Sequence, residues 1–380
     1  MQSFIGAVRR ALASLAGVGR SAEGQAAGGE ESKGSDNPSG KAATESIELS
    51  ETDKIENPHK SSGLRKYRLG EFEEAVVEFD KALESEPENA GVYVMRGVSK
   101  DNLGLFEEAM ADFSCALNIE PDNGEIYVNR GVTRHRFGET ESALADLDQA
   151  VRLQPDFAPA FFNRGVVKAS IGQEEGAMAD FDQAVRLKPD YGEALFNRGK
   201  IRGGQGDVKG AIGDFDRALA QRPEDADILV ERGLTRAGDG QLEAAISDFD
   251  SVLELQPSRA DAYYMQGIFK RDLSRHGEAT ADFDEAVRLQ PDNAEIYLER
   301  GRTRLELDRW EDSIEDFGEA IRLQKENIGA YYMRSLARTR LGLLDEAILD
   351  LEEAQRLARA MGSDDLAGRY ERILEELREA

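Results

Sequence analysis

Arginine and aspartate residues recur at intervals of 34 residues, and these charged columns are the first candidates for chemistry. The first column holds seven arginines: Arg96, Arg130, Arg164, Arg198, Arg232, Arg300 and Arg334. A second basic column lies four residues later, one helical turn away: Lys66, Lys100, Arg134, Lys168, Arg202, Arg236, Lys270, Arg304 and Arg338. Carboxylates recur with the same interval: Glu78, Asp112, Asp146, Asp180, Asp214, Asp248, Asp282, Asp316 and Asp350. Opposite charges in fixed register suit either a strip for acidic ligands or ion pairs inside a packed array, and we predict an intramolecular ion ladder.

Other residue types give no pattern typical of a reaction centre. His59, His135 and His276 stand at different places in the repeating pattern, so they do not converge on a metal. Cys115 is the single cysteine, which excludes an intramolecular disulfide. The glycine-rich segment 203–206 follows an expected helix and lacks the GxxxxGK[ST] pattern of a phosphate loop. We therefore expect no catalytic residue, no metal and no cofactor, and a protein that is not an enzyme.

The charged columns belong to an internal repeat. Seven of the ten prolines share the same spacing: Pro87, Pro121, Pro155, Pro189, Pro223, Pro257 and Pro291. With each proline at position 32 of a 34-residue unit, nine units run without insertion over 56–361. Positions 1 to 34 below refer to this unit. A period of this length indicates a repeat architecture.

Each unit is expected to form two antiparallel helices. Glycine at position 15 in seven units separates two halves, and each half carries an apolar stripe at helical spacing. Small residues at positions 8, 20 and 27 allow close approach of the helices, and proline at position 32 ends the second one. A single pair cannot bury its own stripe, so the units must stack into an all-α solenoid. Four additional glycines in helical positions of the fifth unit predict a weak point there: Gly203, Gly204, Gly210 and Gly213.

In these columns the chain resembles the tetratricopeptide repeat (TPR) proteins. The family pattern has a bulky residue at position 4, glycine at 8, alanine at 20 and 27, phenylalanine at 24 and proline at 32. Nine units of this chain match it, over about four-fifths of the sequence. Arginine at position 7 and a basic residue at position 11 are departures from the family's leucine and tyrosine. The resemblance implies a TPR α-solenoid, a right-handed superhelix of antiparallel helix pairs, and a non-enzymatic scaffold or adaptor that binds proteins.

The resemblance also implies a concave groove, lined by positions 2, 5, 6, 9, 12 and 13 of the first helices. We call these the groove positions. The groove residues expected here are apolar at position 5, with a row of asparagines at position 6: Val94, Val128, Phe162, Phe196, Val230, Tyr264 and Tyr332, then Asn129, Asn163 and Asn197. The carboxylate clamp of chaperone adaptors requires lysine at 5 and asparagine at 9. Here Lys60 is followed by Leu64, so we do not expect that clamp.

Three occupants of the groove remain open from the sequence. The asparagines are similar to the ladder of the O-linked N-acetylglucosamine transferase superhelix, because an amide offers a donor and an acceptor to an extended peptide backbone. The apolar row could instead hold a partner helix, or residues 1–20 of the same chain. The alternative for the asparagines themselves is that they are solvated helix positions.

Both ends of the chain differ from the repeats. Residues 362–380 have one apolar face and predict a C-terminal capping helix. Residues 21–55 are rich in glycine, serine, alanine and glutamate and predict a disordered linker. Residues 1–20 carry three arginines, no acid and apolar residues at helical spacing. This basic amphipathic segment fits an export signal, an organelle transit peptide, or a helix that docks on a membrane surface or a partner.

Composition limits the function classes. The 380 residues include 48 Lys+Arg and 75 Asp+Glu, a formal charge of −27, which argues against nucleic acid as a partner. No apolar run is long enough for a transmembrane helix. We predict a cytoplasmic protein with a protein or peptide partner in its groove. The alternative is an assembly factor that residues 1–20 bring to a membrane, an organelle or the cell envelope.

Overall fold

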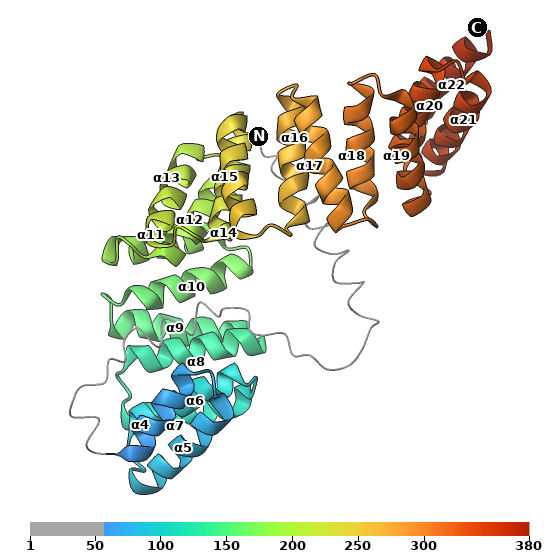
Figure 1. Ribbon diagram of the computed structural model, residues 1–380. Helices are drawn as coiled ribbons and strands as arrows, with labels where there is room; N and C mark the ends of the chain where they lie inside the picture. Colours follow the sequence, from blue (N-terminus) through green and yellow to red (C-terminus); the bar gives the residue numbers. More distant parts are fainter. Residues whose placement is uncertain (1–56, 380) are drawn as a thin grey trace. The chain divides into compact units, whose positions relative to one another are not determined.

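The structure is a computed structural model that describes residues 57–379 (Figure 1). These residues form nineteen α-helices and no strand: nine consecutive helix pairs and one further helix, α22 (Asp364–Glu379). The expected solenoid of antiparallel helix pairs with a C-terminal helix is confirmed. The predictions for residues 1–20 and for the linker 21–55 lie outside the described residues.

The first helix of each pair carries the groove positions. The first helices are α4 (Pro58–Arg68), α6 (Ala90–Asn102), α8 (Gly124–Phe137), α10 (Ala158–Ser170), α12 (Gly192–Gln205), α14 (Ala226–Gly238), α16 (Ala260–Asp272), α18 (Ala294–Leu305) and α20 (Ile328–Arg340). The second helices are α5 (Phe72–Ser85), α7 (Phe106–Ile119), α9 (Thr140–Leu153), α11 (Glu174–Leu187), α13 (Val208–Gln221), α15 (Leu242–Leu255), α17 (His276–Leu289), α19 (Trp310–Leu323) and α21 (Leu344–Ala360).

The chain divides into two compact units. Of the described residues, the N-terminal unit contains 57–202 and 216–222, and the C-terminal unit contains 203–215 and 223–379. The division falls within the fifth helix pair, where α12 and α13 are both helical in spite of their glycines. The weak point expected in this repeat stays a prediction.

Position 15 ends the first helix of each pair with a left-handed residue. Glycine takes this conformation in seven repeats, with φ from 74° to 96°. In repeats seven and eight the same position is Ser274 (φ 60°) and Asp308 (φ 56°). The turn geometry is therefore maintained even where glycine is absent, although a side chain there costs more than glycine does.

In most repeats the core contains a phenylalanine at position 24 that packs against a glycine, and Leu147 and Leu351 take this place in repeats three and nine. The ring at position 24 is fully buried, as in Phe181 and Phe283, and it lies against the glycine at position 8 of the same repeat. A Cβ atom added at Gly165 would stand only 2.7 Å from the ring of Phe181. Close approach of the two helices therefore depends on the missing side chain, as the columns of small residues predict.

The first and the last repeat of the array end in different ways. Positions 3 and 10 are buried in the second repeat, as Val92 and Ser99, whereas their equivalents in the first repeat, Pro58 and Arg65, are exposed. At the other end α22 packs its Ala367, Tyr370 and Leu374 against α21. A polar first face and a covering last helix are what a stack of repeats needs to end in water.

Candidate functional site

The charged columns form an ion ladder inside the array. In repeat four, Arg164 donates from Nε and Nη2 to the two carboxylate oxygens of Asp180, at 2.9 and 2.6 Å. Its Nη1 donates to Asp148 of the preceding repeat at 2.8 Å, and its guanidinium lies over the ring of Phe161. The Nζ of Lys168 is 2.8 Å from Asp180. One arginine thus connects its own second helix to that of the preceding repeat.

The same bidentate arginine–aspartate pair recurs in further repeats of both units. The further pairs are Arg96–Asp112, Arg130–Asp146, Arg232–Asp248, Arg300–Asp316 and Arg334–Asp350. The aspartates are buried, and burial raises the pKa of Asp316 even though Arg300 and Arg304 both pair with it. The ladder is therefore intramolecular, as predicted, and Arg96, Arg164 and Arg300 also pair with an aspartate of the preceding repeat.

Repeat one departs from the ladder. Ser62 stands at position 7, so the acid of this repeat, Glu78, has other partners than the expected column. His59 Nδ1 and Lys81 Nζ each lie 2.8 Å from one of its oxygens. Hydrogen bonds from His59 and Lys81 lower the pKa of Glu78 to about 2. The expected pairing of the position-11 residue with this acid is corrected here, because Ser62 carries no charge and Lys66 lies 4.0 Å from Glu71, while His59 and Lys81 contact Glu78.

In repeat seven the arginine of the ion ladder is replaced by glutamine. Gln266 replaces the arginine and donates from Nε2 to Asp250, at 2.6 Å, and to the carbonyl of Ile246, at 3.2 Å. The carboxylate of Asp282 has Lys270 as its partner, with 2.6 Å between Nζ and Oδ2. Burial raises the pKa of Asp282, an effect that Lys270 only partly opposes. A buried acid with raised pKa destabilises the fold above its unfolded pKa.

Replacing Gln266 by arginine is expected to stabilise the C-terminal unit at pH 7 by about 1 kcal/mol, because a guanidinium would complete the rung with Asp282. The gain should shrink as the pH falls through the raised pKa of Asp282, since a protonated carboxyl no longer pairs with it. Denaturant midpoints at several pH values measure this. Ala281→Arg, on the exposed side of α17, adds the same charge as a control; an equal gain there would refute the rung.

The seven apolar residues expected in the groove differ in exposure. Four are at most 8% exposed: Val128, Phe162, Val230 and Tyr264. Phe162, for example, packs against Phe181 and Tyr191, with centroid separations of 6.1 and 5.0 Å. These four side chains belong to the packing between helices and leave little surface for a ligand. The other three are partly exposed: Val94, Phe196 and Tyr332.

The three asparagines at position 6 differ in exposure and in hydrogen bonding. Asn163 is buried and donates from Nδ2 to the carbonyl of Pro159 at 2.9 Å, and Asn197 donates in the same way to Glu193. Both amides therefore bond one turn back along their own helix. Asn129 is partly exposed. Beside it, on the same faces of α8 and α10, Val132 and Val166 are also partly exposed.

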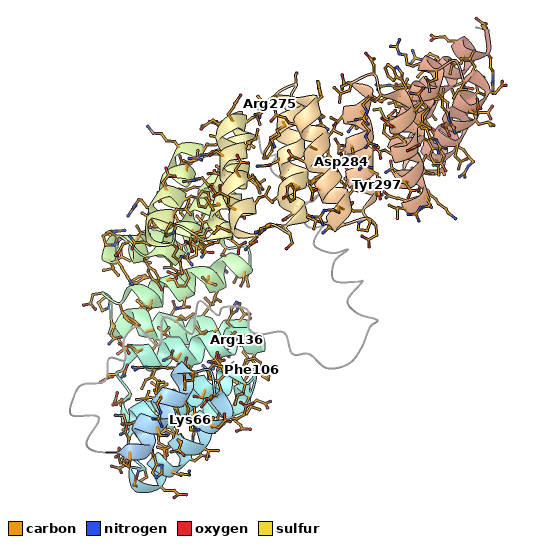
Figure 2. The ribbon with its side chains drawn as sticks, in the orientation of Figure 1. Lys66, Phe106, Arg136, Arg275, Asp284 and Tyr297 are labelled. Carbon is orange, nitrogen blue, oxygen red and sulfur yellow. The ribbon has the colours of Figure 1, made fainter. Side chains whose placement is uncertain are left out.

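Two ionic clusters at the groove positions are not part of the repeating pattern. In the N-terminal unit, buried Asp101 accepts hydrogen bonds from Thr133 and from Arg136 of the next repeat. The guanidinium of Arg136 lies over Phe106, 5.2 Å from the ring centroid (Figure 2). Burial raises the pKa of Asp101. In the sequence, this cluster corresponds to charged residues at positions 12 and 13. These positions are not among those where one residue type recurs from repeat to repeat.

The second cluster is in the C-terminal unit. Buried Glu299 of α18 pairs with Arg271 of α16 and, at 2.8 Å, with Arg302 one turn along its own helix. Arg271 also donates to Asp272. These contacts show that groove positions of successive first helices are neighbours, so they share one surface within each unit.

The three histidines lie in separate repeats, as the sequence indicates, and Cys115 is exposed on α7. Among residues 57–379 no group of histidine, cysteine or carboxylate side chains has the arrangement of a metal site. No helix in this described part is long and apolar enough to cross a membrane.

Comparison with protein families decides the assignment. The tetratricopeptide repeat model matches residues 62–125, 128–192, 196–260, 230–294 and 298–362. The chain belongs to the tetratricopeptide repeat family. No curated protein sequence matches the chain significantly.

Solved TPR structures resemble parts of the chain. YrrB, a TPR protein with an unusual peptide-binding site, is 26% identical over 48% of this chain and 95% of its own, with a TM-score of 0.45. A TPR protein from Parabacteroides merdae ATCC 43184 is 19% identical over 65% of this chain and 98% of its own, with a TM-score of 0.48. PilW, a type IV pilus biogenesis factor, is 22% identical over 56% and 98%, with a TM-score of 0.49.

Membership of the TPR family indicates a protein–protein interaction scaffold with a protein or peptide partner. TPR repeats are generally interaction modules rather than enzymes. Because fold alone does not specify a ligand, the binding surface must be argued from the residues of this chain.

Proposed function

We propose that this TPR protein is an adaptor whose first helices in repeats two to five hold an extended peptide or a partner helix. One observation carries the proposal. The positions that hold the fold repeat almost without change, whereas the groove positions differ from repeat to repeat. At position 9, for example, Val132 and Val166 are followed by Lys200. A surface that varies while its scaffold is constant presents a distinct pattern that one partner can match.

The accessible part of this surface suits an amphipathic ligand. Val132 and Val166 offer partly exposed apolar area, Asn129 a partly exposed amide, and Arg136 an exposed cation held in place by Asp101 and Phe106. A side chain already held in one conformation loses less entropy when a ligand binds. The extended-peptide and helix modes both require this combination of apolar and polar contacts.

The double substitution Val132→Glu with Val166→Glu should lower recovery of the partner at least tenfold, because two carboxylates would have to be desolvated in the contact. Quantitative affinity capture with the full chain measures it. Val77→Glu with Ala111→Glu, on exposed sites of α5 and α7, is the matched control. Equal losses in both variants would contradict binding at the first helices.

Alanine substitutions of Asn129 and Asn163 should have different effects on binding and on stability. Asn129→Ala is expected to weaken partner binding with little change in stability, because its amide is partly exposed. Asn163→Ala should instead lower the free energy of unfolding by about 1 kcal/mol, since a buried hydrogen bond is lost. Binding and unfolding titrations of the two variants test the pair. A stronger binding defect for Asn163→Ala would favour the equal three-rung ladder.

A further inference from the structure

The groove positions of the two units carry opposite charge. In repeats one to five, through residue 202, they hold four basic and three acidic residues: Lys60, Arg68, Arg136 and Lys200, with Asp101, Glu125 and Glu193. In repeats six to nine they hold three basic and seven acidic residues: Arg271, Arg302 and Arg340, with Asp227, Glu231, Asp261, Asp272, Glu295, Glu299 and Glu306. The surface of the C-terminal unit therefore favours a cationic ligand.

The arginines of this acidic surface are already engaged. Arg271 and Arg302 both pair with Glu299, and the guanidinium of Arg340 lies over Trp310, 6.0 Å from the ring centroid. Glu295 and Glu306 are exposed, and neither has an ion pair among residues 57–379. Arg259 pairs with Asp227 and Asp261, so the exposed carboxylates that remain for a cationic ligand are those of Glu295 and Glu306.

Apolar side chains lie on the same helices. Leu298 is one turn from Glu295 on α18, and Ile268 of α16 is one turn from Arg271; both are partly exposed. Leu336 of α20 is 37% exposed. A surface of carboxylates and aliphatic side chains is complementary to a basic amphipathic segment.

The chain itself contains such a segment. Residues 1–20 carry Arg9, Arg10 and Arg20, no acid, and five apolar residues at helical spacing: Phe4, Ile5, Val8, Leu12 and Leu15. The intervening 21–56 have the opposite character, with nine acidic and three basic residues. A chain of 36 residues can span about 30 Å as a flexible coil and at most about 120 Å when fully extended, which is long enough for residues 1–20 to reach beyond repeat one.

We propose that residues 1–20 dock on the groove surface of the C-terminal unit, at Glu295, Leu298 and Glu306. The inference rests on the proposed function, because it assigns an occupant to the same class of surface. The chain then carries its own competitor: a partner of similar basic, amphipathic chemistry must displace residues 1–20 before it binds the C-terminal unit.

Fluorescence anisotropy with a labelled synthetic peptide of residues 1–20 tests the docking. The full chain with Arg9→Glu and Arg10→Glu, termed the opened chain, should bind this peptide saturably. The wild-type chain should bind it at least fivefold more weakly, since its own segment occupies the surface. Adding Glu295→Gln and Glu306→Gln to the opened chain should weaken binding at least fivefold. Adding Glu243→Gln and Glu254→Gln, on exposed sites of α15, should change it less than twofold.

Three results would overturn the docking: no saturable binding to the opened chain, equal affinity for the opened and wild-type chains, or equal losses in the two glutamine variants. Peptide that partitions onto vesicles containing anionic lipid but not onto the opened chain would assign residues 1–20 to a membrane surface instead. Circular dichroism confirms that the variants are folded. Partner capture through Val132 and Val166 concerns the other unit, so failure there is distinguishable from failure here.

Discussion

Replacing Arg300 by methionine is expected to lower the free energy of unfolding of the C-terminal unit by about 3–5 kcal/mol. Arg300 donates to both oxygens of Asp316, with 2.6 Å for the shorter contact, and its Nη1 donates to Asp284 of the preceding repeat at 2.7 Å. Methionine preserves much of the apolar stem but removes every donor and the guanidinium that lies over the ring of Tyr297. Asp316 would then be left buried with Arg304 alone, and burial already raises its pKa.

Chemical denaturation followed by circular dichroism, with hydrogen exchange to localise the change, measures this loss. Arg288→Met is the matched control, because Arg288 forms an exposed pair with Glu285 on α17 and such pairs contribute less than about 1 kcal/mol. Adding Asp316→Asn to Arg300→Met should recover part of the loss by removing the buried charge. A loss below about 1 kcal/mol for Arg300→Met would show that the ladder is not what holds the repeats together.

Gly267→Ala is expected to destabilise the C-terminal unit by about 1–3 kcal/mol, although alanine is the better helix former. A Cβ atom at this position would lie 2.7 Å from Cε1 of Phe283 and 2.8 Å from Cζ. Phe283 is fully buried, so its ring cannot move aside without displacing the neighbouring helices. The steric cost therefore exceeds the gain in helix propensity.

The same substitution at Gly213 should have the opposite sign. Gly213 lies in α13, within the glycine-rich fifth repeat, and an added Cβ would meet no atom within 4 Å. Gly213→Ala should therefore stabilise the protein by up to about 1 kcal/mol through propensity alone. Thermal melts of the two variants give the comparison. Destabilisation by both, or by neither, would contradict the account of glycine at position 8.

The features that could be predicted from the sequence are those that recur. A 34-residue period fixes which columns face each other, so the helix pairs, the contact of glycine with phenylalanine and most of the ladder follow from one unit. The two repeats that depart from the ladder could also be identified from the sequence, because position 7 is not arginine there: it is Ser62 in repeat one and Gln266 in repeat seven.

Features that depend on local packing could not be predicted from the recurring positions of the repeat. Val94 and Val128 share a column and a residue type, yet Val94 is partly exposed and Val128 is buried. Phe162 is likewise buried whereas Phe196 is partly exposed, so side-chain size alone does not predict burial at this position. Asn163 bonds to its own helix rather than facing outward. The clusters around Asp101 and Glu299 each use one repeat's particular residues. Periodicity predicts what is common to the repeats, whereas a binding surface consists of what distinguishes them.

This distinction explains how one scaffold can serve a specific partner. The ion ladder and the buried rings are satisfied within the chain, so they stabilise the stack without selecting a ligand. The groove positions carry an apolar and amide surface in one unit and an acidic surface in the other. Substitutions in the ladder and at the exposed groove positions should consequently separate stability from binding.

Site-specific photo-crosslinking tests the central claim most directly. A photoreactive amino acid at Val132, on the first helix α8, should crosslink to a discrete partner in the full-length protein. The same amino acid at Ala179, exposed on the second helix α11, should give no such product. This result would place the partner on the first helices. Crosslinking at Ala179 but not at Val132 would contradict the account and assign binding to the second helices.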